Sequence, residues 1–200
     1  GSHSSKLFTG AAKRGAYAYS VHPMFAFTRR DGNTAGLEDA CFTAEGDEER
    51  LDEVCGIFRR CNNRVLVINQ KDKALYHLAN VAVSNLVLAL LSLGFDCFEK
   101  CGIERETAMA AAAPLICNNV NNVLEQGLSQ ALTGPIERND EGTVLAHADV
   151  LFGTLRGVYP LLSLRLCALA KKKHPGRDYE RLEKLLYAIA RDINIEVERI

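Results

Sequence analysis

The sequence predicts an α/β portion followed by an all-helical portion, with the change near residue 70. Two observations support this fold class. Short apolar runs of strand-like composition alternate with helical patterns only before residue 70. After residue 70, long helical patterns follow one another and no convincing strand remains. We therefore expect two domains, residues 1–70 and residues 71–200, in a chain of 200 residues that is long enough to bury a core.

The first portion should contain a helix, a strand, a polar loop, a second strand, an amphipathic helix and a third strand. In that order the residues are 4–14, 16–21, 28–39, 40–46, 47–60 and 64–69. Asp47 is expected to cap the amphipathic helix, whose apolar residues recur at helical spacing. The last strand, "RVLVIN", is a continuous apolar run, which is typical of a strand buried on both faces.

The second portion should contain four helices. They are predicted at residues 71–93, 104–128 with a kink or break at Pro114, 141–169 with an interruption near 157–160, and 179–198. Asp140 could cap the third helix. The first helix is apolar around most of its circumference, so we expect it to be buried. Its most apolar run, Val81 to Leu93, is too short to span a bilayer, which predicts no membrane partner.

Composition and charge exclude several functional classes. Lys and Arg number 24 against 25 Asp and Glu, so neither a nucleic-acid surface nor a polybasic membrane patch is expected. The seven cysteines have neither C-x-x-C nor zinc-finger spacing, which predicts no metal site. Free thiols are typical of a reducing cytosol, so we expect a cytoplasmic protein.

The helix 71–93 carries a stripe of polar residues. Lys73, His77, Asn80 and Ser84 are spaced by 4, 3 and 4 residues and share one helix face. In one interpretation this stripe faces solvent near the start of the helix. In the other it lines a wet cleft, where Lys73 and His77 are available for proton transfer or for binding a carboxylate.

Two candidates follow in the helical portion. Asn122 belongs to "ICNNVNNVLEQG", where the amides either bond between helices, face solvent, or bind a polar substrate. Arg138 belongs to "LTGPIERND", which is either a capped loop or an anchor for a carboxylate or phosphate.

His22 lies in "SVHPMFAF", directly after a predicted strand and before Pro23. The proline restricts His22 to extended geometry. The imidazole is either a satisfied structural histidine or a cleft residue at the carboxyl end of a strand, where α/β sheets usually bind ligands.

At these residues the sequence resembles a known family. The stretches "GSHSSKLF", "YSVHPMFAF", "FTAEGDEERL", "DKALYHLANVAVSN" and "ALTGPIERND", followed by Thr143 and His147, occur in order through nearly the whole chain. They resemble predicted NAD(P)-dependent oxidoreductases with an N-terminal Rossmann domain and a C-terminal helical domain, DUF2520. The helical domain is related to the dimerisation domain of 6-phosphogluconate dehydrogenase.

The resemblance implies that residues 1–70 are the later part of a Rossmann-like domain and that "GSHSS" is native sequence inside it. The glycine fingerprint G-x-G-x-x-G is absent from the chain, so its first half should be missing. This absence argues against NADP or NAD binding by the chain as it stands. The helical domain, residues 71–200, should form a homodimer.

The resemblance also implies roles for particular residues. "HPMF" is similar to the His-Pro-Met segment of prephenate and arogenate dehydrogenases, where the histidine bonds the substrate beside the nicotinamide. By this likeness His22 orients the reacting oxygen, and Ser20 and Pro23 lie with it against the cofactor. In the wider β-hydroxyacid dehydrogenase and ketopantoate reductase group, Lys73 and Asn80 have the nearest equivalents, although the spacing differs and His77 stands where an asparagine is usual.

The implied function is hydride transfer to or from a small carboxylate-bearing substrate, such as a 2-oxo acid resembling ketopantoate. Lys73 or His77 would handle the proton, Asn80 and Ser84 would position the substrate, and Arg138 would anchor its carboxylate. The alternative is a homodimerisation or ligand-binding remnant without catalysis.

Overall fold

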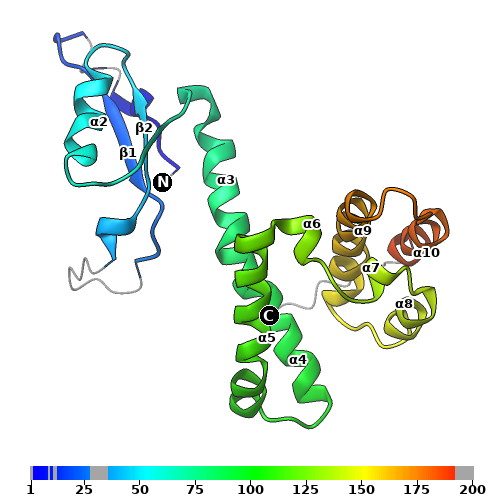
Figure 1. Ribbon diagram of the computed structural model, residues 1–200. Helices are drawn as coiled ribbons and strands as arrows, with labels where there is room; N and C mark the ends of the chain where they lie inside the picture. Colours follow the sequence, from blue (N-terminus) through cyan, green and yellow to red (C-terminus); the bar gives the residue numbers. More distant parts are fainter. Residues whose placement is uncertain (1, 9, 11–12, 28–35, 192–200) are drawn as a thin grey trace. The chain divides into compact units, whose positions relative to one another are not determined.

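The computed structural model describes residues 2–8, 10, 13–27 and 36–191 (Figure 1). The chain forms two compact units, residues 1–90 and 91–200. The first contains a three-stranded sheet and the second only helices in its described part, so the predicted fold class is confirmed. The boundary between the units falls inside a helix, whereas the assignment of residues 1–70 and 71–200 to separate family domains stays a prediction.

The sheet of the first unit has the order β1-β2-β3. Its strands are β1 (Tyr19–Pro23), β2 (Phe42–Gly46) and β3 (Val65–Val67). β1 is antiparallel to β2, and β2 is parallel to β3. The helix α2 (Leu51–Arg59) connects the two parallel strands. Short 3-10 helices flank these elements: η1 (Ser5–Phe8), η2 (Leu37–Asp39) and η3 (Gln70–Asp72).

The helix α2 packs beside one face of the sheet (Figure 1). The rings of Phe42 and Phe58 stack with centroids 4.5 Å apart, and Cys55 is fully buried. Side chains alternate across a strand, so Phe42 and Ala44 face α2 while their neighbours Thr43 and Glu45 face the other way. The sheet therefore has one apolar face against α2 and a second, polar face.

Three sequence predictions for this unit need correction. β3 is not buried, because it lies at the edge of the sheet and Leu66 and Val67 are more than half exposed. Asp47 does not cap α2: its carboxylate accepts a bond of 2.6 Å from the backbone N–H of Ala18, and Arg50 precedes the helix in a left-handed conformation. The predicted helix 4–14 is not continuous in its described part, because residues 5–8 form a 3-10 helix and residues 13–15 form a turn.

The limits of two strands and one loop also differ from the prediction. β1 runs through Pro23, whereas the strand was predicted at 16–21, and β2 begins at Phe42 rather than at residue 40. Within the predicted polar loop, residues 28–35 lie outside the described residues and 37–39 form η2.

The predicted helix 71–93 is two helices, α3 (Lys73–Val83) and α4 (Asn85–Lys100). The backbone of Ser84 leaves the helical region at φ −127° and ψ −79°, and its hydroxyl donates a bond of 2.6 Å to the carbonyl of Asn80. A serine that bonds back to the preceding turn weakens the helix locally, which accounts for the break.

The prediction that this helical stretch is buried is wrong. Its large apolar side chains are mostly exposed within the described chain, for example Leu75 at 68% and Val83 at 75%. The run from Val81 to Leu93 is too short to span a bilayer, but the stretch Gln70–Lys100 that contains it is longer, with an 18-residue window of mean hydropathy 1.9. By length and composition alone it could cross a membrane.

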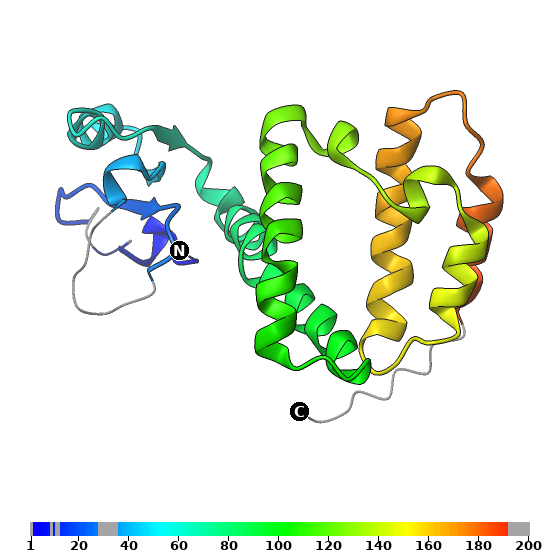
Figure 2. The ribbon, with the colours of Figure 1, turned by 60° about the horizontal axis from the view of Figure 1, so that its bottom comes forward.

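The second unit is helical throughout its described part. After the end of α4 come α5 (Arg105–Gln126), α6 (Leu128–Ala131), α7 (Pro135–Arg138), α8 (Glu141–Ala148), α9 (Leu155–Lys173) and α10 (Glu180–Arg191). α9 lies beside α10 and α7 in both views (Figures 1 and 2). The core of these helices consists of fully buried Val144, Cys167, Tyr179, Leu182 and Leu186, with Ile136 and Ala170.

Two prolines that were expected to interrupt helices lie inside continuous ones. Pro114 is within α5 and Pro160 within α9. A proline in a helix interior removes one backbone bond, and here that loss does not end either helix. The interruption in the stretch 141–169 comes earlier, at residues 149–154. The predicted cap of α8 is confirmed, because the Asp140 carboxylate accepts a bond of 3.0 Å from the backbone N–H of Thr143.

Candidate functional site

Polar side chains gather on the face of the sheet opposite α2. Cross-strand pairing places Ser20 opposite Glu45 and His22 opposite Thr43. Paired residues share a face, so these four side chains lie on one side of the sheet. Thr43 and Glu45 are fully buried there. Burying polar groups is unfavourable unless they form hydrogen bonds or ion pairs, so this buried polar face is the candidate functional site.

The Glu45 carboxylate is held from the N-terminal segment. It accepts a bond of 2.9 Å from the backbone N–H of Ser5 and one of 2.7 Å from the Ser5 hydroxyl. Gln70 in turn donates its Nε2–H to the Ser5 hydroxyl oxygen at 2.5 Å. Segments far apart in the sequence thus fix one buried carboxylate, and the segment "GSHSS" contributes directly to this site.

Lys73 is the counter-ion of this carboxylate. It is only 2% exposed, and its Nζ lies 3.9 Å from Glu45 Oε1. That separation is too long for a hydrogen bond, and Nζ has no hydrogen-bond partner among the described residues. Burial lowers the pKa of Lys73, and the charge of Glu45 opposes this effect. Lys73 therefore releases its proton more readily than a lysine at the surface.

A histidine–tyrosine pair lies beside this lysine. His22 Nδ1 is 2.9 Å from the hydroxyl of Tyr76, and the two rings are nearly perpendicular. Lys73 Nζ is 5.7 Å from the centre of the Tyr76 ring. Burial lowers the pKa of His22, and the nearby positive charge of Lys73 lowers it further. His22 is therefore mostly neutral near pH 7. If its proton is on Nε2, the Tyr76 hydroxyl donates to Nδ1 and leaves Nε2–H free to donate.

The reason given for expecting His22 at a ligand site needs correction. Ligands bind at the carboxyl ends of parallel strands, but β1 runs antiparallel to β2. The carboxyl end of β1 therefore lies beside the start of β2. His22 reaches the buried polar cluster because its side chain is on the polar face, opposite Thr43.

The polar stripe on α3 is only partly brought into this site. Asn80 Nδ2 donates a bond of 2.8 Å to the carbonyl of Tyr76, and Ser84 donates to the carbonyl of Asn80. Both side chains are thus engaged with their own helix. His77 is half-buried one turn after Lys73. In β1, the Ser20 hydroxyl donates a bond of 3.1 Å to the carbonyl of His3, and Pro23 ends the strand.

The remaining predicted site residues belong to the second unit. Asn122 is exposed on α5. The side chain of Arg138 is 60% exposed, with its Nη2 3.8 Å from the Asp140 carboxylate. Arg138 thus retains donors that are available to solvent or to an anion.

Sequence reasoning missed Ser5, Thr43, Glu45 and Tyr76. A signal for the strand residues was present, because Thr43 and Glu45 alternate with the apolar Phe42 and Ala44 in "FTAEG". That alternation indicates a polar face but does not show that it is buried. Tyr76 is one turn from Lys73 on the same helix, and only the structure shows that it meets His22.

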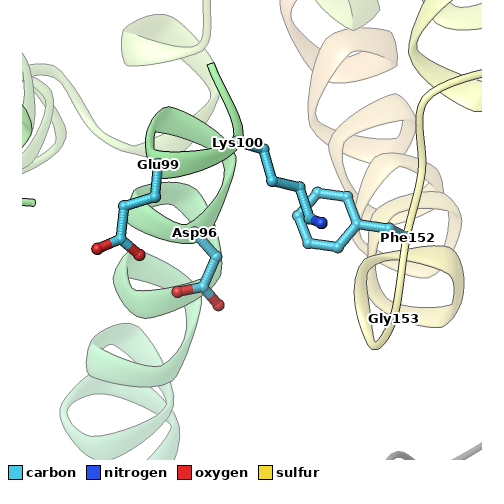
Figure 3. Close-up of a pocket in the computed structure, with 5 residues that line it drawn as sticks. All are labelled: Asp96, Glu99, Lys100, Phe152 and Gly153. Carbon is cyan, nitrogen blue, oxygen red and sulfur yellow. The ribbon is translucent and has the colours of Figure 1, made fainter. Parts of the chain in front are cut away.

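The second unit has a pocket of its own, with a volume of about 490 Å³ (Figure 3). It is lined by Asp96, Glu99, Lys100, Phe152 and Gly153. Its charged groups are already engaged, because Arg105 donates to both carboxylates and Lys100 Nζ lies 4.4 Å above the Phe152 ring. The pocket contains none of the predicted site residues, so the polar face of the sheet remains the candidate site.

Comparison with models of known protein families assigns the chain to one family. Residues 40–166 match the family described as "Domain of unknown function (DUF2520)". The chain belongs to the DUF2520 family. The matched segment begins just before β2 and includes Thr43, Glu45, Lys73 and Tyr76, whereas Ser5 and His22 precede it.

Solved structures share the fold of this DUF2520 chain. Protein TM1727 from Thermotoga maritima is similar over 95% of this chain and 66% of its own, with 25% identity and a TM-score of 0.63. The "putative NADP oxidoreductase BF3122" from Bacteroides fragilis is similar over 87% of this chain and 62% of its own, with 19% identity and a TM-score of 0.60. The chain thus spans slightly less than two thirds of either protein. The search of curated proteins found no match.

Proposed function

We propose that this chain forms the substrate side of a cytoplasmic, NADP-linked oxidoreductase that acts on a small polar compound. The observation that carries this proposal is the buried Lys73 beside the His22–Tyr76 pair, with a lowered pKa and an Nζ that has no hydrogen-bond partner among the described residues. Perturbed ionisable groups cluster at functional sites because catalysis needs them. The fold shared with a protein named as an NADP oxidoreductase supports the same reaction class.

The described residues fit a small substrate better than they fit the phosphates of a dinucleotide. A pyrophosphate is usually held by a glycine-rich turn and the start of a helix. Here the turn after β2 is filled by the chain itself: the backbone N–H of Asp47 donates to the carbonyl of Ala18. A Cβ on Gly46 would lie 2.3 Å from the same carbonyl oxygen. When bound, NADPH would supply a hydride or NADP⁺ would accept one.

The chain's own residues have complementary roles in this proposal. Lys73 holds the proton that the reacting oxygen gains or loses, and Glu45 keeps the ammonium in place through its charge. Neutral His22 orients the oxygen through Nε2–H, while Tyr76 fixes the imidazole ring. His77 is the second candidate for the proton, one turn further along α3. Asn80 and Ser84 act indirectly, by shaping the end of this helix.

Arg138 of the second unit has the chemistry to bind a carboxylate, because its exposed guanidinium is only loosely paired with Asp140. A 2-oxo acid is therefore the substrate class that we would test first.

The experiment compares Lys73→Met with Lys71→Met in the natural protein, using NADPH oxidation against a panel of 2-oxo acids. Lys71 is exposed two residues earlier and serves as the matched control. Loss of a positioned proton donor should lower kcat/KM by about 10²–10⁴-fold in Lys73→Met. The control should stay within about twofold of the natural protein. If Lys73→Met and His77→Ala both keep full activity, the site assignment is wrong.

We further propose that the apolar side chains exposed on α3 and α4 pair with a second copy of the chain. Residues 74–95 carry no Asp, Glu, Lys or Arg. Apolar surface of this extent on a soluble protein usually marks an interface. Pairing of a helix with its own copy in a two-fold dimer covers the surface without any other partner. A non-catalytic homodimerisation role is the alternative function, which the activity measurement above distinguishes.

A further inference from the structure

Two buried polar atoms in the first unit have no hydrogen-bond partner among the described residues. They are the hydroxyl oxygen of Thr43, a residue that is 0% exposed, and Nζ of Lys73, which is 2% exposed. An unpaired polar group inside a protein costs free energy, and native proteins rarely keep one without a reason. Thr43 belongs to the polar sheet face, and Lys73 reaches the Glu45 carboxylate on that face from α3. Two such groups in one cluster indicate a partner that comes from outside the chain.

The position of Thr43 is set by the strand register. It lies opposite His22 of β1 on one side and opposite Leu66 of β3 on the other. Glu45 follows two residues later on the same face, about 7 Å along the strand. Lys73 Nζ lies 3.9 Å from Glu45 Oε1, and Thr43 lies opposite His22 on the same sheet face as Glu45, so both unpaired groups belong to one polar cluster. A ligand that satisfied both would lie on the sheet face that carries His22.

The charges of this cluster restrict what such a ligand could be. Glu45 and Lys73 form an ion pair with no net charge, and both are buried. The surrounding Ser5, Gln70 and Tyr76 are neutral side chains, and the lowered pKa keeps His22 mostly neutral. A carboxylate placed here would be a second buried anion sharing one cation with Glu45. An uncharged oxygen would leave the net charge of the Glu45–Lys73 pair at zero.

We propose that the site between Thr43 and Lys73 binds the uncharged carbonyl or hydroxyl oxygen of the substrate and rejects its carboxylate. The Thr43 hydroxyl can donate to a carbonyl oxygen or accept from an alcohol, so it suits both sides of such a conversion. Lys73 Nζ completes the pair of contacts. This inference rests on the proposed function, which it deepens by assigning the orientation of the substrate, and it adds Thr43 as a binding residue.

The test uses two small probes of equal chain length, 2-butanone and butanoate, titrated into the natural protein without NADP and followed by NMR. The uncharged ketone should bind at least about tenfold more tightly than the carboxylate, which corresponds to about 1.4 kcal/mol. Thr43→Val, which removes the hydroxyl and keeps the shape, should weaken ketone binding about tenfold. Thr43→Ser keeps the hydroxyl and should retain most of the affinity.

The stability of the variants separates a binding role from a structural one. Thr43→Val should unfold at the same temperature as the natural protein or higher, because it removes an unpaired buried hydroxyl. If it does not fold, the comparison of Thr43→Ala with Thr43→Ser gives the same information. Thr154→Val changes an exposed threonine of the second unit and should change neither property.

The inference is overturned if butanoate binds as tightly as 2-butanone, or if Thr43→Val binds the ketone as the natural protein does. The second result would mean that the hydroxyl is satisfied by a buried water. Because the titration contains no cofactor, it is independent of turnover. A protein that binds the ketone through Thr43 but never oxidises NADPH would keep this inference and overturn the proposed reaction.

Discussion

Glu45 and Lys73 should respond very differently to mutation, although they form one buried ion pair. Glu45 has two bonds from Ser5 besides its charge interaction, whereas Lys73 Nζ has, within the described part of the chain, only the charge interaction across 3.9 Å. Removing either partner leaves the other in the interior. The loss of folding stability depends on the contacts that the remaining group keeps. These contacts differ between Glu45 and Lys73.

The magnitudes follow from these contacts. At an effective dielectric constant of about 20, unit charges 3.9 Å apart attract by about 4 kcal/mol. Glu45→Gln removes this attraction and strands a buried ammonium, so it should destabilise the first unit by about 3–5 kcal/mol. Lys73→Met loses the same attraction but also removes a buried ion that makes no hydrogen bond, which offsets several kcal/mol. The net effect of Lys73→Met should be within about 1 kcal/mol of zero.

Hydrogen exchange of the β2 amides provides the assay, because it reports the free energy of opening this unit separately from the helical unit. The two single variants and the double variant Glu45→Gln/Lys73→Met form a double-mutant cycle. The double variant should be much less destabilised than Glu45→Gln alone. Lys71→Met, at an exposed position, should leave protection of β2 unchanged.

Equal destabilisation by Lys73→Met and Glu45→Gln would refute this reasoning. Lys73 would then be a stabilising residue of the sheet, and its burial would no longer suggest chemistry. The expected asymmetry, in contrast, means that the fold does not need this lysine. Together with loss of turnover in the same variant, it would show a residue kept for function at no gain in stability.

Two further predictions concern pH and assembly. The pKa of His22 in the folded state lies below the unfolded value of about 6.5. Between these two pKa values the folded state binds fewer protons than the unfolded state. The free energy of unfolding should therefore fall as pH drops below about 6.5. In urea unfolding followed by circular dichroism, His22→Gln should flatten this pH dependence relative to the exposed-site control His3→Gln; an unchanged slope would mean that another group is responsible. In sedimentation, the natural protein should be a dimer, and Leu88→Glu on α4 should weaken association at least about 100-fold whereas Leu161→Glu on α9 should not. A monomer, or sedimentation together with lipid vesicles, would contradict the dimer.

Part of the site could be predicted from local patterns and from resemblance. His22 is found in the sequence through the HPMF segment, and Lys73 through its helical spacing from His77 and Asn80. Both residues lie at the candidate site. Asn80 and Ser84 satisfy the same spacing, yet their side chains bond to their own helix. Helical spacing identifies a shared face, but it cannot tell which residues of that face meet a neighbouring element.

The sequence by itself determined the order of the three strands and the approximate positions of the longer helices, because hydrophobic periodicity and caps such as Asp140 act over only a few residues. Only the tertiary structure decided that Glu45 and Thr43 are buried, that Ser5 and Gln70 hold the carboxylate, and that Tyr76 meets His22. It also decided that the apolar α3 and α4 are exposed within this chain. Burial and pairing join residues that are distant in sequence, so they depend on strand register and direction rather than on any local pattern.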